Sequence, residues 1–236
     1  MKKHYAYHSP FKMKDDEGNE YTLTVEHDEY AEDPREYDNL CTMVCWHRRY
    51  NLGDKHHYDD SDELMGDILY RICGMNPDDY DSLSTRDKYK LACESDEIVI
   101  KPINMYEHSG ITVSTSSGYP YNDRWDSCCI GFIYVTKETI LKEIANANEV
   151  NWTAIADEVI ENEMDTYDQY VRGEVYCFGL TKKVVCQDLC PHCGEVIHEY
   201  EEEEVELDFC GGFYGDCLEE NGMLDCLPSG IRFMED

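Results

Sequence analysis

The sequence predicts an α+β fold, a mainly antiparallel sheet packed with two to four helices, and two patterns lead to this prediction. Segments rich in β-branched and aromatic residues, separated by Gly, Ser and Pro turns, cover 97–106, 110–116 and 128–135. Apolar residues three and four positions apart cover 62–73 and 152–171, as in helices that bury one face. Hydrophobic residues make up 42% and aromatic residues 12% of the chain, so it can bury a core, unlike acidic disordered proteins.

The N-terminal part predicts strands separated by polar loops. Residues 4–13 and 21–30 predict a hairpin around the turn DDEGNE, and the apolar run 41–47 predicts a short strand. Between them lies an acidic loop, 26–38, which holds seven acids and one Arg. The expected helix N-caps are Ser61 for 62–73, Ser84 for a short helix near 85–94, and Thr136 for a helix from about 137.

Two glycines are expected to end the longer helices, Gly74 after 62–73 and Gly173 after 152–171. Beyond Gly173, segments 174–185 and 195–209 are expected to pair as a long hairpin around a Cys-rich segment. Four consecutive glutamates break the alternation of apolar residues in its second strand, which predicts a bulge or an exposed bend there. We find no linker-like stretch and no repeat, which indicates one acidic domain over 1–236, with 174–210 as a hairpin appendage carrying a Cys-rich tip.

The chain carries 52 acidic residues against 20 Lys plus Arg, a formal net charge of −32. Such a charge repels itself in the compact state, and solubility alone needs a magnitude of only roughly 2–8. It argues against direct nucleic-acid binding and indicates repulsion of nucleic acid, imitation of it, or a basic protein partner. No apolar run approaches the roughly 18 residues of a membrane span, and the N-terminus lacks the apolar stretch of a signal peptide. We therefore expect a cytoplasmic protein whose 13 cysteines stay reduced.

The segment Cys190-Pro-His-Cys193-Gly has the form of a zinc knuckle, in which two sulfurs on a Gly-ended turn point at one ion. Tetrahedral zinc needs two further ligands. On a regular hairpin with its tip near residue 190, Cys186 and His198 are close along the two strands. The alternative is a loop of thiols without metal. The expected structural zinc site therefore consists of Cys186, Cys190, Cys193 and His198, with Cys210 or Cys217 as substitutes.

Two acidic surfaces are candidates for binding a partner. On the helix at 152–171 the acids lie opposite the apolar stripe, and those from 157 to 168 span about 16 Å at about 1.5 Å per residue, too sparse to imitate a duplex alone. An acidic strand beside the helix would raise that density, and YEEEEVELD supplies one. The alternatives are a solvated acidic face without a partner and the buffering of metal ions. The candidate partner-binding residues are Asp157, Glu161, Asp165, Asp168, Glu201, Glu202, Glu203 and Glu204.

The segment WHRRYNLGDKHHY (46–58) concentrates positive charge in a negative chain. One interpretation is an anion-binding or catalytic loop, because a carboxylate beside imidazole supports acid–base chemistry near neutral pH. The favoured interpretation is structural, with ion pairs to the acidic loop 26–38. No Gly-rich phosphate loop, GxSxG elbow or HExxH pair is present. The candidate catalytic residues under the first interpretation are His47, His56, Glu107, His108 and Asp126.

Several strings together resemble a family of acidic proteins found in bacteriophages and mobile elements, over about residues 20–217: WHRRYNLGDKH, HSGIT, WDS, GFIYVTKE and GGFYG. The chain departs from that family at the CysCys pair 128–129 and in the Cys-rich insertion 186–195. The resemblance carries over no catalytic residues. It implies a phage-type accessory protein, similar in role to anti-CRISPR or anti-restriction inhibitors that occupy a DNA-binding surface.

Charge and resemblance together predict a non-enzymatic inhibitor that meets a basic, nucleic-acid-binding surface of a host nuclease in the bacterial cytoplasm, by DNA mimicry in one form of the hypothesis. Two alternatives remain open. One is an enzyme acting on nucleic acids or nucleotides through the His/Arg loop, and the other is a zinc-stapled module for a different protein partner.

Overall fold

The computed structural model describes residues 3–116 and 127–234, apart from the side chains of residues 185, 186 and 199–204. Its helices and mostly antiparallel sheets confirm the predicted α+β class. From the sequence we expected one domain, whereas the structure divides the chain into two compact units. Unit 1 consists of Met1–Glu32 and Gly173–Asp236, and unit 2 is Asp33–Arg172.

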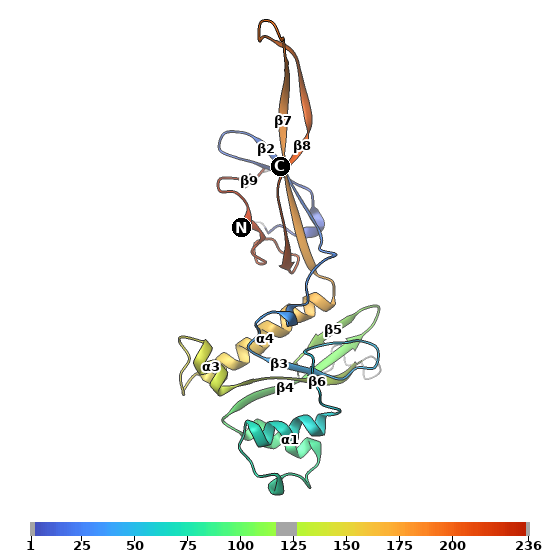
Figure 1. Ribbon diagram of the computed structural model, residues 1–236, viewed down its shortest axis with the longest axis vertical. Coiled ribbons are helices and arrows are strands. Elements are labelled where there is room, and N and C mark those ends of the chain that lie inside the picture. Colours follow the sequence, from blue (N-terminus) through green and yellow to red (C-terminus); the bar gives the residue numbers. More distant parts are fainter. Residues whose placement is uncertain (1–2, 117–126, 235–236) are drawn as a thin grey trace. The chain divides into compact units, whose positions relative to one another are not determined.

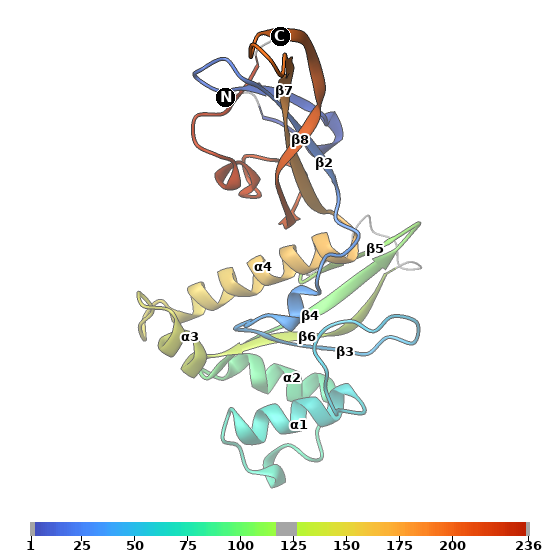
Figure 2. The same ribbon diagram turned by 45° about the horizontal axis from the view of Figure 1, so that its top comes forward.

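Unit 2 is a three-layer α/β sandwich around a four-stranded antiparallel sheet of order β3-β6-β4-β5. One face is covered by α3 and α4 and the other by α1 and α2 (Figure 2). The strands are β3 (Thr42–Cys45), β4 (Ile98–Glu107), β5 (Ile111–Ser114) and β6 (Ser127–Thr136). The helices are α1 (Ser61–Arg71), α2 (Thr85–Glu94), α3 (Lys137–Glu143) and α4 (Trp152–Val171), with short 3-10 turns η2 (Pro34–Glu36) and η3 (Pro77–Asp79).

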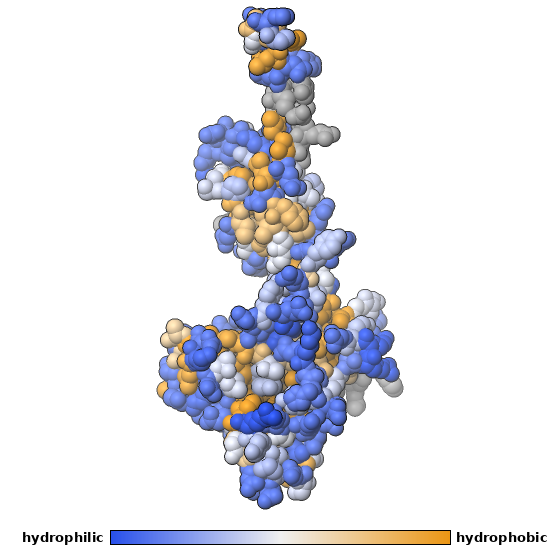
Figure 3. Space-filling view, in the orientation of Figure 1, coloured by the Kyte–Doolittle hydropathy of each residue, from blue (hydrophilic) through white to orange (hydrophobic). Residues whose placement is uncertain are grey.

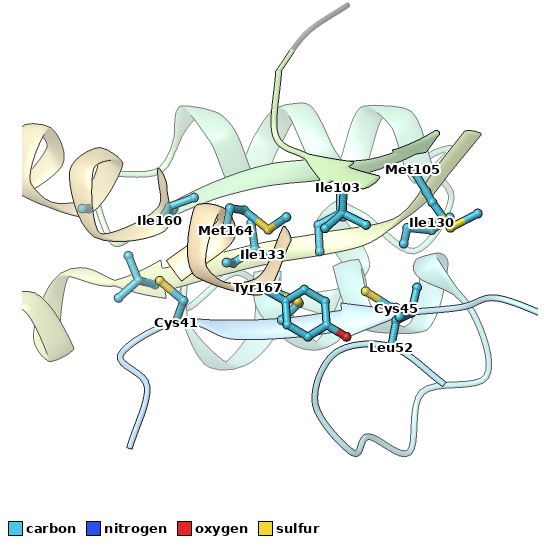
Figure 4. Packing of buried hydrophobic residues seen from close by; sticks show 14 of the residues in the cluster. Cys41, Cys45, Leu52, Ile103, Met105, Ile130, Ile133, Ile160, Met164 and Tyr167 are labelled. Carbon is cyan, nitrogen blue, oxygen red and sulfur yellow. The ribbon is translucent and has the colours of Figure 1, made fainter. Parts of the chain in front are cut away.

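Alternation along the strands supplies both cores of unit 2, because successive side chains point to opposite faces. Ile103 of β4 packs with Met164 and Tyr167 of α4 (Figure 4), while Ile98 and Ile100 of the same strand pack toward α1 and α2. The Tyr167 hydroxyl accepts the Gly53 N–H at 2.8 Å, which gives this buried polar tip a partner.

The capping predictions are confirmed at two helices and wrong at one. Ser84 accepts the Asp87 N–H at the start of α2, and Thr136 accepts the Thr139 N–H at the start of α3. At α1 the N-cap is Asp60 instead of Ser61, because its carboxylate accepts the N–H groups of Asp62 and Glu63. A carboxylate also gains from the helix dipole, which a serine hydroxyl does not.

Unit 1 is built around a five-stranded antiparallel sheet of order β8-β7-β2-β1-β9. The predicted hairpins are both present, β1 with β2 and β7 with β8, and β2 joins them by pairing with β7. The first strand is shorter than predicted, because Ala6–His8 form the 3-10 turn η1 and β1 begins at Phe11. The core of the unit includes Leu23, Phe178 and Leu180 from the sheet, together with Leu218 and Met223 from the C-terminal segment. Its elements are β1 (Phe11–Lys14), β2 (Glu20–His27), β7 (Val175–Leu189), β8 (Val196–Tyr214), β9 (Arg232–Phe233), η1 (Ala6–His8) and η5 (Met223–Cys226).

The β7–β8 hairpin extends past the rest of this sheet (Figure 1). The pairing of β7 with β2 ends at Lys182, so the remainder of β7 pairs with β8 alone. The register shifts between Lys182, which faces Val205, and Val184, which faces Glu202. One residue of β7 therefore opposes two of β8, which confirms the bulge predicted at the glutamate run.

Candidate functional site

The projecting part of the hairpin lies in the longest stretch of the chain without Lys or Arg. The 48 residues 184–231 contain 13 acids and no Lys or Arg. Nine of those acids lie within 184–209, which we call the acidic hairpin. Unit 1 as a whole holds 24 acids against 7 Lys plus Arg, compared with 28 against 13 in the longer unit 2. Negative charge is therefore densest in unit 1.

An exposed row of apolar side chains runs along β8 beside these acids. Val205, Leu207 and Phe209 are 44%, 49% and 62% exposed, and the alternating Glu206 and Asp208 are exposed as well. Phe209 faces Gly179 across the hairpin, so no cross-strand side chain covers its ring. Apolar residues interrupt the hydrophilic surface of the hairpin in Figure 3.

Because β8 is the outermost strand of the sheet, it also presents one edge that the sheet does not pair. A long apolar edge strand invites association, and charged residues on the strand restrict which chains can approach it. The acidic hairpin is thus a surface that repels acidic chains and offers apolar and backbone contacts to a basic one.

The acids of α4, in contrast, have partners within unit 2. Asp157 and Glu161 both pair with Lys101 of β4, at 2.8 and 3.2 Å. Asp168 accepts the Val113 N–H at 2.7 Å and so satisfies a backbone donor of the edge strand β5. Of the four predicted helix residues, one is thus structural and two are partly neutralised.

Asp165 is exposed as a residue, but its carboxyl is partly desolvated. This desolvation and the negative charges of Asp168 and Glu161 raise its pKa above the ordinary value. The glutamates predicted in the strand fall within β8, where Glu201 and Glu202 face Val185 and Val184 across the hairpin. The side chains of Glu201, Glu202, Glu203 and Glu204 lie outside the described part of the structure.

At the hairpin tip, the turn brings together two of the four predicted zinc ligands, Cys190 and Cys193. The Cys190 N–H donates to the Glu195 carbonyl at 2.7 Å, and the Gly194 N–H donates to the Cys190 carbonyl at 2.9 Å. His198 lies in β8 opposite Asp188, and Cys186 lies in β7 with its side chain outside the described part. Among the described residues, no group of three or more His, Cys, Asp or Glu side chains is arranged to hold a metal ion.

Three of the five candidate catalytic residues line one surface pocket of unit 2. The pocket has a volume of about 760 Å³ and lies where the loop after β3 meets the β4–β5 turn. Ser109 in that turn has a φ of 59°, a conformation that residues other than glycine rarely adopt. The functional side chains around the pocket are His47, Arg48, Arg49, Glu107, His108 and Ser127.

Glu107 is the centre of the contacts in this pocket. It pairs with Arg49 and accepts the Tyr50 hydroxyl at 2.9 Å, and this hydrogen bond raises the pKa of Tyr50. His47 stacks on Tyr50 with ring centroids 5.1 Å apart. The Ser127 hydroxyl is buried at the pocket and has no hydrogen-bond partner among the described residues, a condition that a bound ligand would relieve.

The other two candidate catalytic residues do not join this pocket. His56 packs between Trp46 and Tyr58, and its Nε2 bonds to the Cys45 carbonyl at 2.9 Å, which is a structural role. Asp126 lies outside the described residues.

The favoured ion pairs between the His/Arg loop and the acidic loop form in part. Lys55 lies 3.8 Å from Glu36, and Arg35 of the acidic loop binds Asp54 at 2.8 Å. Arg49 pairs instead with Glu107, far along the chain.

Comparisons with protein-family models, with curated proteins and with solved structures found no match. Among the described residues, no helix is both long and apolar enough to cross a membrane. The apolar row on β8 is the feature that sequence reasoning missed, because alternation of apolar residues ordinarily indicates a buried strand face.

Proposed function

We propose that this protein is a non-enzymatic inhibitor that binds the basic, nucleic-acid-binding surface of a host nuclease through the acidic hairpin. One observation carries this function. Strand β8 contains many acids and no Lys or Arg, and beside the acids the apolar side chains of Val205, Leu207 and Phe209 are exposed. The resemblance to acidic phage proteins supports a host target of the kind that anti-CRISPR or anti-restriction inhibitors bind.

The spacing of the charges favours competition with nucleic acid over close imitation of a duplex. Seven acids lie between Glu199 and Asp208. At about 3.3 Å per residue they span about 30 Å, roughly one charge per 5 Å, against about 3.4 Å in a DNA strand. The strand can therefore satisfy a row of Lys and Arg, while the apolar row supplies contacts that DNA lacks.

The attraction between charges and the apolar contact should respond differently to salt. Attraction between exposed charges is screened beyond about 8 Å at physiological ionic strength, whereas burial of apolar area is not. Binding should weaken as salt rises and should keep a residual affinity that Phe209→Ser removes. A pull-down from a bacterial host lysate at low and high salt, with and without added DNA, identifies the target, and competition by DNA places it at the nucleic-acid site.

Charge reversal on the hairpin tests the function directly. Glu206→Lys with Asp208→Lys should weaken binding to the captured nuclease by about 10-fold or more at low salt, because it opposes the basic surface and slows association. The control is Asp78→Lys with Asp79→Lys on η3 of unit 2, two exposed acids whose reversal changes the net charge equally. If both variants lost affinity equally, the effect would come from the overall charge and not from the hairpin. If the hairpin variant kept its affinity, the proposed binding surface would be wrong.

A second candidate function, from a different class, is an enzyme acting on a phosphate-bearing nucleic acid or nucleotide at the His47–His108 pocket. The specific observation in its favour is the buried Ser127 hydroxyl, which has no hydrogen-bond partner within 3–116 and 127–234, in a pocket lined by Arg48, Arg49 and two histidines. Guanidinium groups suit phosphate oxygens, and imidazole beside a carboxylate suits proton transfer.

His108→Ala tests this second function. It should abolish turnover of nucleic-acid or nucleotide substrates without lowering the melting temperature, because the side chain lines the pocket and belongs to neither core. The matched control is His57→Ala in the same positive loop, an exposed histidine that does not line this pocket. If His108→Ala turned over substrate as the parent does, His108 and its pocket would not be the active site.

A further inference from the structure

The pocket of unit 2 that contains His47 and His108 holds two polar groups to which the described residues give no partner. Ser127 is 9% exposed, and its buried hydroxyl forms no hydrogen bond there. Arg48 is exposed and forms no ion pair there. Both residues line the same pocket. A buried polar group without a partner is rare in folded proteins, and a bound ligand is one of its ordinary explanations.

An arginine without an ion pair is unusual in this acidic unit. Unit 2 holds 28 acids against 13 Lys plus Arg. Of its described Lys and Arg residues, all except Arg48 and Arg86 lie 3.8 Å or less from a carboxylate oxygen. The other arginine of the pocket, Arg49, is paired with Glu107. Arg48 is therefore the arginine of this pocket that remains available to an anion.

The order of the strands brings the two groups to one pocket. Ser127 begins β6 and faces Tyr106 of β4, while Arg48 follows β3, which pairs with β6 on its other side. The pocket volume of about 760 Å³ lies within the range of about 300–1,000 Å³ that is typical of small-molecule sites. Trp46 also lines the pocket, and its indole N–H donates to the Tyr58 carbonyl at 2.9 Å, which holds the ring in place.

We propose that this pocket binds a small phosphate-bearing molecule of the nucleoside monophosphate class, with Arg48 and Ser127 as donors to the phosphate oxygens. A guanidinium donates two parallel hydrogen bonds to a phosphate, and a hydroxyl donates one. Trp46 offers an aromatic surface for the base. A bound water would satisfy Ser127 but would leave Arg48 without a counter-charge, whereas a phosphate satisfies both.

The acidity around the pocket restricts the ligand to a small molecule. Asp59 and Asp60 lie beside Trp46 in the adjoining pocket. Exposed charges act over about 8 Å at physiological ionic strength, and a nucleic-acid strand carries a phosphate about every 3.4 Å. The phosphates on either side of a bound one would therefore meet repulsion that a mononucleotide avoids. The inference rests on the pocket of the second candidate function, narrows its substrate to nucleotides, and holds whether or not a reaction follows.

The test is isothermal titration calorimetry of the purified full-length chain with four probes: AMP, inorganic phosphate, adenosine and a short single-stranded oligonucleotide. We expect AMP to bind at one site per chain, inorganic phosphate to bind more weakly, and adenosine not to bind. The oligonucleotide should bind more weakly than AMP at low salt, and this difference should shrink as salt rises because the repulsion is screened.

Two variants assign the binding to the proposed donors. Arg48→Met and Ser127→Ala should each lower the affinity for AMP by about 10-fold or more, because each removes a hydrogen bond to a charged group. Ser127→Ala should also keep or raise the melting temperature, because it removes a buried hydroxyl without a partner, whereas loss of a structural contact would lower it. The matched control is Arg86→Met on α2, which does not line this pocket and should bind AMP as the parent does.

Four results would overturn the proposal. If neither AMP nor phosphate bound, the pocket would not be an anion site. If both variants kept the parent's affinity, the phosphate would bind elsewhere. If AMP bound no more tightly than phosphate or adenosine, the ligand would not be a nucleotide, and if the oligonucleotide bound more tightly, it would be a polymer. The assay involves neither the nuclease nor turnover, so these results are separate from the hairpin charge-reversal and His108→Ala tests.

Discussion

Replacing Arg35 by methionine should destabilise unit 2 by about 3–5 kcal/mol, because the change leaves carboxylates without their buried cation. The Arg35 side chain is 3% exposed, and it binds Asp54 at 2.8 Å and Glu163 at 2.7 Å. It also donates to the Cys41 carbonyl at 2.7 Å. Burial alone would lower the pKa of this guanidinium, but the bonds to Asp54 and Glu163 outweigh it and raise the pKa, so Arg35 remains charged.

The loss should be large because both carboxylates also organise backbone. Glu163 accepts the Leu40 N–H at 2.8 Å, and Asp54 accepts the Met43 N–H at 2.7 Å. One cation therefore holds the loop before β3, the loop after it, and α4 together. A domain has a total stability of about 5–15 kcal/mol, so such a loss removes a large fraction of it.

Urea denaturation followed through tryptophan fluorescence measures this effect, because all three tryptophans of the chain belong to unit 2. The control is Arg71→Met, which removes an exposed i,i+4 ion pair with Asp67 and should cost less than about 1 kcal/mol. Similar midpoints for the two variants would contradict the role assigned to Arg35. Arg35→Met combined with Glu163→Gln should recover part of the stability, because it removes one of the two unpaired charges.

The sequence predicted local structure well because local structure depends on neighbouring residues. The stripe on α4, the caps Ser84 and Thr136 and the bulge at the glutamate run each arise from residues within a few positions of one another. The division into two units could not be predicted from neighbouring residues. Unit 1 combines both ends of the chain, and its boundaries at Glu32 and Gly173 carry no linker composition.

Candidate site residues were harder to predict, because charge patterns do not reveal partners. Asp168 and Asp165 look equivalent on a helical projection, yet Asp168 accepts the N–H of Val113, a residue 55 positions away. Likewise, His47 follows β3 and Glu107 ends β4, and they meet at one pocket because β6 pairs with both strands and brings these ends to the same side of the sheet. Arg49 and Tyr50 are partners of Glu107 that sequence spacing alone does not indicate.

Gly131→Ala should produce the second large loss, by pushing β3 away from β6. A Cβ at this position would lie 2.1 Å from the Val44 carbonyl oxygen and 2.8 Å from the Cys45 Cα, both backbone atoms. Neither can move as a side chain does, so the strand pair must separate at this point. Overpacking of this kind costs about 1–3 kcal/mol and occasionally more, and we expect the upper end because backbone is displaced.

The displacement should reach the pocket, because β3 leads directly into it. The Trp46 N–H donates to the Ile130 carbonyl at 2.7 Å next to Gly131, and His47 follows Trp46 at the pocket wall. We therefore expect a lower melting temperature of unit 2 together with a shifted His47 imidazole resonance in NMR spectra. The matched control is Gly179→Ala in β7, where a Cβ meets nothing within 4 Å. It should leave unit 1 unchanged or stabilise it by about 0.4–1 kcal/mol through the unfolded chain. If Gly131→Ala were tolerated as well as Gly179→Ala, the close contact of β3 with β6 would not be what positions the His47 side of the pocket.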